Sequence, residues 1–112
     1  MKRKMKVKEL TEKLNLKILT EGDLEREVTG CYSGDLLSWV MSRAKEGDAW
    51  LTVMGNVNAV AVAVLSDCAC IILTENAPLD DVAKEKAIQQ DITFLMSNKN
   101  AYELSVEISK LI

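Results

Sequence analysis

The 112-residue sequence contains no histidine. Histidine is the commonest general base at neutral pH and the usual partner of a catalytic Cys or Ser, so catalysis of those kinds is not expected. Cysteine is scarce as well, with three residues, of which Cys68 and Cys70 are two positions apart. Two thiols do not complete a tetrahedral zinc site, and Cys31 is not an obvious third ligand. We therefore expect no catalytic residue, metal or cofactor, and we interpret Cys68 and Cys70 as buried thiols on one face of a strand.

Long apolar runs are also missing. The longest candidate, residues 57–73, is interrupted by Asn58, Ser66 and Asp67, so we expect no membrane-spanning segment. The first eight residues hold five basic groups with no apolar stretch behind them, which is unlike a secretory signal. A basic start can contact nucleic acid or acidic lipid, but a solvated beginning of the first helix is the simpler interpretation. We expect a cytoplasmic protein with reduced thiols and no nucleic-acid or membrane partner.

The remaining composition is typical of a soluble globular protein. Hydrophobic residues make up 48% of the chain and charged residues 28%, and the formal net charge is −3. One Pro and five Gly leave little room for a linker. A chain of this length can bury one core without disulfides or metals, so we expect a single domain over residues 1–112.

Hydrophobic periodicity predicts the first elements. Val7, Leu10 and Leu14 recur at helical spacing and predict a helix over residues 6–14. Residues 16–19 predict a short strand, and Glu-Gly-Asp at residues 21–23 predicts a turn.

The stretch over residues 28–76 carries the strongest signals, beginning with an extended piece and a Gly-Ser-Gly turn. Ser33, Gly34 and Asp35 offer capping groups for a helix that ends at Gly47. Trp39 lies well off the centre of the apolar stripe of that helix. The stripe that we expect to face inward is Leu36, Leu37, Val40, Met41 and Ala44.

Residues 49–53 and 68–73 predict two buried strands, but the segment between them is ambiguous. Residues 58–65 alternate Ala and Val, which fits a strand as well as a helix of small residues. Alternation favours a strand, whereas two apolar faces, the poor strand propensity of Ala and the strand that follows so soon favour a helix. We predict a helix, capped by Asn56 or Asn58 and packed tightly on a sheet.

The last third predicts a helix, a strand and a final helix. Pro78 and the acidic pair at residues 80–81 open the first helix, and residues 92–96 form the strand. Asn100 and Glu103 resemble the capping box of the last helix. The residues that we expect to face inward are Val82, Ala83, Ala87 and Ile88 in the first helix and Ala101, Leu104, Ile108 and Leu111 in the second.

Strands and helices therefore alternate from residue 28 onward. Alternation is typical of βαβ units with right-handed crossovers. The fold class that we predict is α/β, with a mainly parallel central sheet of about five strands and helices on both faces.

In such a sheet, ligands bind beyond the carboxyl ends of the strands, beside helix N-termini. Three loops qualify here: residues 29–35, 54–58 and 74–80. Neither GxGxxG nor GxxxxGK[ST] is present, and helix capping, with Gly relieving backbone strain, is the simpler explanation of the same loop residues. The candidate ligand-binding residues are Gly30, Ser33, Gly34, Asp35, Asn56, Asn58 and Thr74.

Trp39, with Arg43 four residues later, is the candidate interface. Aromatic side chains that do not enter the core are favoured at contacts between proteins, although ligand stacking is the alternative use. We therefore predict a homodimer.

The sequence also resembles a known family, the DRTGG domain. The similar segments are GCYSGDLLSWVMSRAKEGDAWLT, NVNAVAVAVLSDCACIILTEN, the spaced A-x-x-x-x-I-x-F-L pattern and the opening VKELTEKLNLKILTEG, which together cover nearly the whole chain. The resemblance implies an α/β domain related to the amino-terminal domain of HPr kinase/phosphorylase. Similar domains in phosphotransacetylases and between the CBS domains of some pyrophosphatases are associated with regulation or dimerisation.

Two positions in the family pattern deserve comparison with this chain. The resemblance places the family's Asp on Asp35 and its Thr-Gly-Gly on Thr74, Glu75 and Asn76, so both glycines are missing here. Glycine would allow close approach of a ligand to the backbone, and Glu75 would repel an anion. The family implies no active site.

Two functions are consistent with these features. The first is a non-catalytic regulatory or interaction domain that acts as a homodimer or with a partner protein. The alternative is a small-ligand sensor that binds a nucleotide or other anionic metabolite at the loops after the strands.

Overall fold

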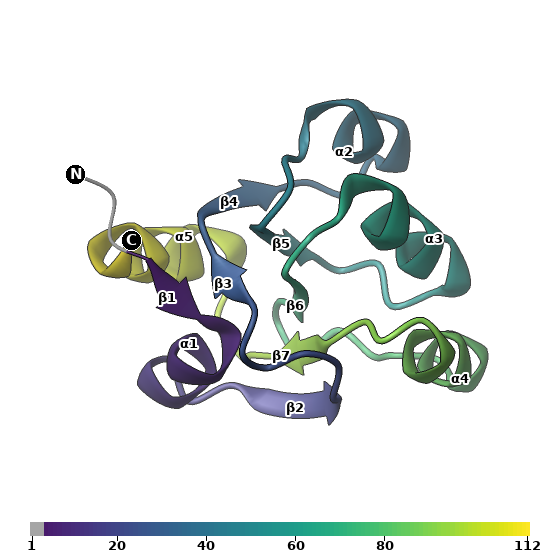
Figure 1. Ribbon diagram of the computed structural model, residues 1–112, viewed down its shortest axis with the longest axis horizontal. Helices are drawn as coiled ribbons and strands as arrows, with labels where there is room; N and C mark the ends of the chain where they lie inside the picture. The colour runs from purple at the N-terminus through teal and green to yellow at the C-terminus, as the bar shows by residue number, and fades with distance from the viewer. Residues whose placement is uncertain (1–3) are drawn as a thin grey trace.

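The computed structural model describes residues 4–112, so two of the five basic residues of the opening lie outside the described part. Strands and helices alternate along the chain (Figure 1). The elements are β1 (Met5–Lys6), α1 (Val7–Lys13), β2 (Lys17–Thr20), β3 (Glu27–Val28), β4 (Gly30–Ser33), α2 (Leu37–Arg43), β5 (Asp48–Thr52), α3 (Val57–Ser66), β6 (Cys70–Leu73), α4 (Asp81–Gln89), β7 (Phe94–Met96) and α5 (Ala101–Leu111).

The central sheet has five strands in the order β2-β7-β6-β5-β4. The four strands from β4 to β7 are parallel, and β2 pairs with β7 in the antiparallel direction. β1 and β3 form a separate antiparallel pair. The predicted α/β class and mainly parallel five-stranded sheet are therefore confirmed.

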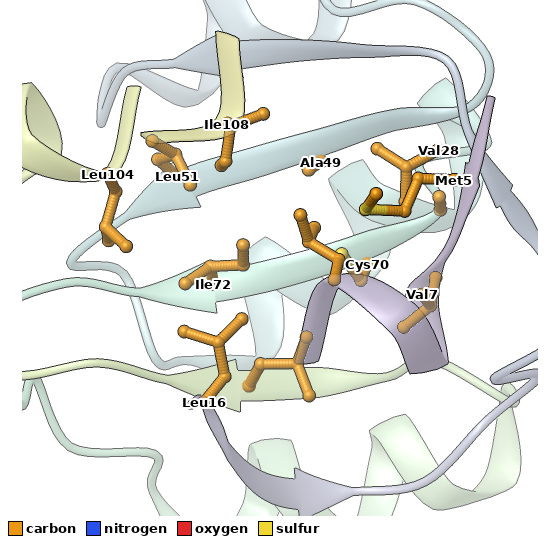
Figure 2. Close-up of a cluster of buried hydrophobic side chains, with 13 residues drawn as sticks. Met5, Val7, Leu16, Val28, Ala49, Leu51, Cys70, Ile72, Leu104 and Ile108 are labelled. Carbon is orange, nitrogen blue, oxygen red and sulfur yellow. The ribbon is translucent and has the colours of Figure 1, made fainter. Parts of the chain in front are cut away.

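Helices cover both faces of the sheet (Figure 1). α1, α5 and the β1–β3 pair enclose the first core, and α2, α3 and α4 enclose the second. Figure 2 shows the first core, to which Met5 and Val28 contribute from the β1–β3 pair and Leu104 and Ile108 from α5. Because the inner strands carry apolar residues on both faces, β5 is buried along its whole length.

Capping follows the predictions at three helices. The Asn56 side chain accepts a hydrogen bond from the Ala59 N–H at 3.0 Å and starts α3, so the Ala-Val segment is a helix. Asp80 caps α4 in the same way, and Asn100 and Glu103 form the expected capping box of α5. None of the helices within residues 4–112 has the length and apolarity needed to cross a bilayer.

The predicted inward stripe of α2 is wrong for two residues. Val40 is fully buried, but Leu36 is 60% exposed and Met41 is 49% exposed. α2 has only seven residues and begins at Leu37, so Leu36 precedes the helix and turns to solvent. Ser33 and Asp35 do not cap it, because the Asp35 carboxylate binds the end of β5 instead.

Two residues of α4 also differ from the prediction. Only Ala83 and Ala87 are buried, whereas Val82 and Ile88 are 64% and 57% exposed. Two alanines one helical turn apart allow α4 to lie close to the layer beneath it. The larger side chains flanking them are then left at the sides of the helix.

Two further predictions about the sequence pattern are corrected. Gly30 and Ser33 belong to the edge strand β4, which was expected to be a turn. Cys68 precedes β6 and packs in the second core, while Cys70 packs in the first. The two thiols do not share a strand face, because the left-handed residue Asp67 delays the start of the strand until Cys70.

Candidate functional site

The carboxyl ends of the parallel strands meet at one edge of the sheet, as the topology requires. The N–H of Thr74, after β6, donates to the Thr52 carbonyl at the end of β5. The N–H of Asn76 donates to the Ser97 carbonyl after β7. The loops after β4, β5, β6 and β7 are thus tied together, and we call this region the carboxyl edge.

Asp35 connects the loop after β4 with the end of β5. Its Oδ1 accepts a hydrogen bond from the Thr52 hydroxyl at 2.7 Å and another from the Val53 N–H at 3.0 Å. Thr52 is buried, and its hydroxyl in turn accepts from the Met54 N–H at 3.2 Å. The Asp35 carboxylate therefore fixes the backbone at the carboxyl edge.

Gly34 is committed to the core through both of its backbone groups. Its N–H donates to the Leu51 carbonyl at 3.1 Å, and its carbonyl accepts from the indole N–H of Trp50 at 2.9 Å. Trp50 is fully buried. The N–H of Gly34 is therefore unavailable to an anion in this arrangement.

Asn56 and Asn58 have different environments. Asn56 is half-buried and caps α3, whereas Asn58 is exposed in the first turn of that helix. The preceding residue, Gly55, touches the loop before α4, where its carbonyl accepts from the Asp80 N–H at 2.9 Å. These contacts join the start of α3 to the start of α4.

The segment Thr74-Glu75-Asn76 has a special backbone. Thr74 is buried, and both Glu75 and Asn76 adopt φ of 55°, in the left-handed region that favours glycine. These are the positions at which the DRTGG resemblance would place two glycines, and the left-handed backbone here is one that glycine adopts without strain. The N–H of Glu75 donates to the Lys99 carbonyl at 2.9 Å.

These contacts determine what the carboxyl edge offers a ligand. The structure brings Asp35, Asn56 and Thr74 to the same edge, but the N–H groups described above are used within the protein. Lys99, a nearby cation, pairs with Glu107 at 2.6 Å. Exposed carboxylates of Asp35 and Glu75 disfavour a phosphate here. No set of three or more Cys, Asp or Glu residues within residues 4–112 is arranged to hold a metal ion.

Gly30 and Ser33 lie apart from that group, along the edge strand β4. They line a cavity of about 300 Å³ between β4 and α5. Sequence reasoning missed this cavity because no local pattern indicates that α5 covers β4. Its lining residues are Thr29, Gly30, Cys31, Ser33, Ser105, Ile108, Ser109 and Ile112.

Cys31 lies on the rim of this cavity and is a free thiol. Desolvation and the nearby Asp48 carboxylate raise the pKa of Cys31 to about 11. Burial likewise raises the pKa of Cys68 to about 12. Since the thiolate is the nucleophile, the raised pKa values lower the reactivity of both thiols at neutral pH.

Trp39 and Arg43 form a pair on the surface of α2. Trp39 is 54% exposed, and the guanidinium carbon of Arg43 lies 3.6 Å from the centroid of its ring. The contact is a cation–π interaction between residues one helical turn apart. The position of Trp39 outside the core agrees with the prediction from the helical spacing.

A larger apolar surface lies on α3, and sequence reasoning missed it. Val57, Ala61, Val64 and Leu65 are all exposed, at i, i+4, i+7 and i+8 of the helix. We call these four residues the α3 stripe. A groove of about 360 Å³ separates the stripe from Lys86 and Gln90 at α4. The spacing of the four residues is visible in the sequence, but the prediction was of a helix packed tightly on a sheet, and it named no exposed face.

Comparisons with known proteins bear on the fold. No model of a known protein family matches this chain, and no curated protein matches it. A similar solved structure is that of the CBS and DRTGG domains of the regulatory region of Clostridium perfringens pyrophosphatase, complexed with the activator diadenosine tetraphosphate. The two superpose with a TM-score of 0.75 at 13% sequence identity.

The superposition covers 92% of this chain and 45% of the pyrophosphatase region. This chain therefore corresponds to less than half of that region. At this level of identity the similarity establishes a shared fold, and it supports the DRTGG-like domain that the sequence resemblance implied.

Proposed function

We propose that this domain is a non-catalytic regulatory or interaction module that acts as a homodimer, with the α3 stripe at the centre of the interface. The observation that carries the proposal is the exposure of the stripe. Val57, Val64 and Leu65 are 39%, 42% and 71% exposed. The regulatory role of the pyrophosphatase region with the same fold supports a regulatory function over a catalytic one.

Apart from Asn58 and Ser66 near its two ends, α3 consists of Val, Ala and Leu. Its inner face buries Ala59, Val60 and Ala63, yet its outer face is also formed by Val, Ala and Leu. A helix that is hydrophobic on every side is normally buried on every side. In this chain the sheet covers one side of α3 and α2 and α4 flank it, so the composition of the exposed side fits a helix that a partner covers there.

Apolar side chains on the adjoining helices enlarge the surface. α2 and α4 both pack against α3 and lie in the same layer (Figure 1). These side chains add to the apolar surface of the α3 stripe, and each partner of a standard interface buries about 800 Å². The exposed large apolar residues at α2 and α4 are Leu36, which directly precedes α2, and Trp39, Met41, Val82 and Ile88.

The stripe is suited to a second copy of itself. Ala61 lies at its middle, with Val57 four residues before and Leu65 four residues after. Two copies of α3 crossing at Ala61 in opposite directions would place Val57 of each against Leu65 of the other, and the small Ala side chain would allow close approach. Such self-complementarity is what an isologous two-fold interface needs, and no charge lies in the stripe to oppose it.

Light scattering coupled to size exclusion tests this proposal. We expect the 12.4-kDa chain to elute as a dimer at tens of micromolar. Ala61→Glu would bury a carboxylate at the two-fold axis, without a helix-propensity penalty of note, and should weaken association by about 100-fold or more. Tyr102→Glu, on α5 at a residue that is 78% exposed, is the matched control and should remain dimeric.

Other outcomes would change the interpretation. A wild-type chain that is monomeric at tens of micromolar contradicts the dimer. Trp39→Asp distinguishes the two candidate surfaces: if it dissociates the dimer and Ala61→Glu does not, the interface lies around Trp39 and Arg43.

A second candidate function is a small-ligand sensor for a nucleotide or other anionic metabolite at the carboxyl edge. The complex of the pyrophosphatase region with diadenosine tetraphosphate favours it. Diadenosine tetraphosphate, ATP and AMP at a hundred times their dissociation constant would each raise stability by about 2.7 kcal/mol and hence the melting temperature. Absence of any thermal shift with these nucleotides at millimolar concentration would leave the interaction module alone.

A further inference from the structure

The two edges of the central sheet differ in how they are protected. At one edge, β2 carries Lys17, and its register with β7 is interrupted between Ile18 and Thr20. Lysine and irregular register both oppose pairing with a further strand. At the other edge, the four residues of β4, Gly30–Ser33, contain no charge and no proline and keep a regular register with β5.

The unprotected edge adjoins the cavity between β4 and α5. Cys31 pairs with Ala49, a residue of the first core, whereas Tyr32 pairs with Trp50, a residue of the second. Side chains alternate along a strand, so Cys31 and Ser33 face the α5 side. A strand added beside β4 would direct every second side chain into this cavity.

Small residues keep the cavity open. Ser105 and Ser109 stand on the α5 wall, one helical turn apart, and buried Ile108 lies between them in sequence. Longer apolar residues at the two serine positions would fill the space. The volume of about 300 Å³ is large enough for two or three aliphatic side chains and too small for a folded element.

We propose that β4 and the cavity beside it bind an extended, uncharged peptide segment of a partner protein by strand addition. The main chain of the peptide would pair with the free edge of β4, and alternate apolar side chains would contact Ile108 and Ile112. Main-chain pairing supplies affinity in this mode of recognition, and the pocket for alternate side chains supplies specificity.

The chemistry of the lining selects this occupant. No charged side chain lines the cavity, so a charged residue entering it would lose its hydration without gaining an ion pair. A second copy of β4 is a poorer occupant, because four residues fall far short of the roughly 800 Å² that each partner of a stable interface buries. The α3 stripe lies across the sheet from α5, so a dimer formed there leaves β4 free.

Selection from a displayed library of random heptapeptides tests the proposal. The full chain is the target, and Ser109→Leu, which fills the cavity from an exposed position, is used for counter-selection. Ser42→Leu is the matched control, because Ser42 is also an exposed helical serine whose hydroxyl bonds back to its own helix. We expect enriched peptides to carry apolar residues at alternate positions and to lose at least tenfold in affinity with Ser109→Leu but not with Ser42→Leu.

Two further readouts separate strand addition from simple adhesion. A selected peptide can be N-methylated either at its odd-numbered or at its even-numbered residues, and one of these two variants should lose at least tenfold in affinity. Amide chemical-shift changes in the protein should centre on residues 29–33 and 105–112. The proposal would be overturned if no peptide were enriched on the wild-type chain relative to Ser109→Leu. It would also be overturned if both N-methylated variants bound as tightly as the parent peptide. Light scattering on Ser109→Leu reports the dimer separately, so failure of one proposal is distinguishable from failure of the other.

Discussion

Replacing Trp50 by alanine is expected to lower the free energy of unfolding by about 3–5 kcal/mol. Trp50 is fully buried in the second core, between the sheet and the layer of α2, α3 and α4. Its indole N–H also donates to the Gly34 carbonyl at 2.9 Å. The variant removes a large apolar side chain and leaves both a cavity and a carbonyl without its partner.

Trp50→Phe keeps this prediction measurable even where the alanine variant does not fold. It retains most of the apolar contact but removes the hydrogen bond and part of the volume, so a loss of about 1–3 kcal/mol is expected. Trp39→Phe makes the same substitution at a half-exposed site, where the main intramolecular change is to the contact with Arg43, worth about 0.5–1 kcal/mol. Urea denaturation followed by circular dichroism, at one protein concentration, compares the variants. Equal losses for Trp50→Phe and Trp39→Phe would contradict the burial argument.

Replacing Gly55 by alanine is expected to cost about 2–3 kcal/mol, because the added carbon has no room. An ideal Cβ at Gly55 would overlap the Pro78 carbonyl oxygen and lie 3.0 Å from the Leu79 Cα. Both neighbours are backbone atoms, so the loops before α3 and α4 must separate. The hydrogen bond from the Asp80 N–H to the Gly55 carbonyl would weaken with them.

Gly34→Ala is the matched control for this contact. The nearest atom to a Cβ at Gly34 is Cε2 of Tyr32, at 3.1 Å, and this half-buried side chain can move. A change within about 1 kcal/mol is therefore expected from thermal or urea unfolding. A Gly55→Ala variant as stable as Gly34→Ala would show that the two loops are not held together as described.

Helix starts and strand cores could be predicted from the sequence because their causes are local. Asn56, Asp80 and Asn100 cap their helices through bonds to residues three positions away, and such spacing is visible in the chain. The identity of α3 as a helix followed from the same reasoning, against the alternation that favours a strand. Local hydrogen bonding and periodicity act over one or two turns, which is the range that a sequence pattern reports.

The candidate site could be predicted only in part. The topology of parallel strands correctly places Asp35, Asn56 and Thr74 at one edge, because carboxyl ends of parallel strands must meet there. The separation of Gly30 and Ser33 from that group could not be predicted. Whether an extended piece pairs with a sheet depends on a neighbour distant in sequence, and β4 is a strand because β5 lies beside it.

The sequence by itself determined the α/β class, the order of most elements and the helix caps, since each depends on spacing along the chain. Only the tertiary structure decided which apolar residues stay in water. Periodicity shows that Val57, Ala61, Val64 and Leu65 share a face of α3, but the extent to which neighbours cover that face depends on layers assembled from the whole chain. The cavity beside β4 has the same origin, because it forms only where α5 packs against the sheet, and no local pattern in the sequence indicates that contact.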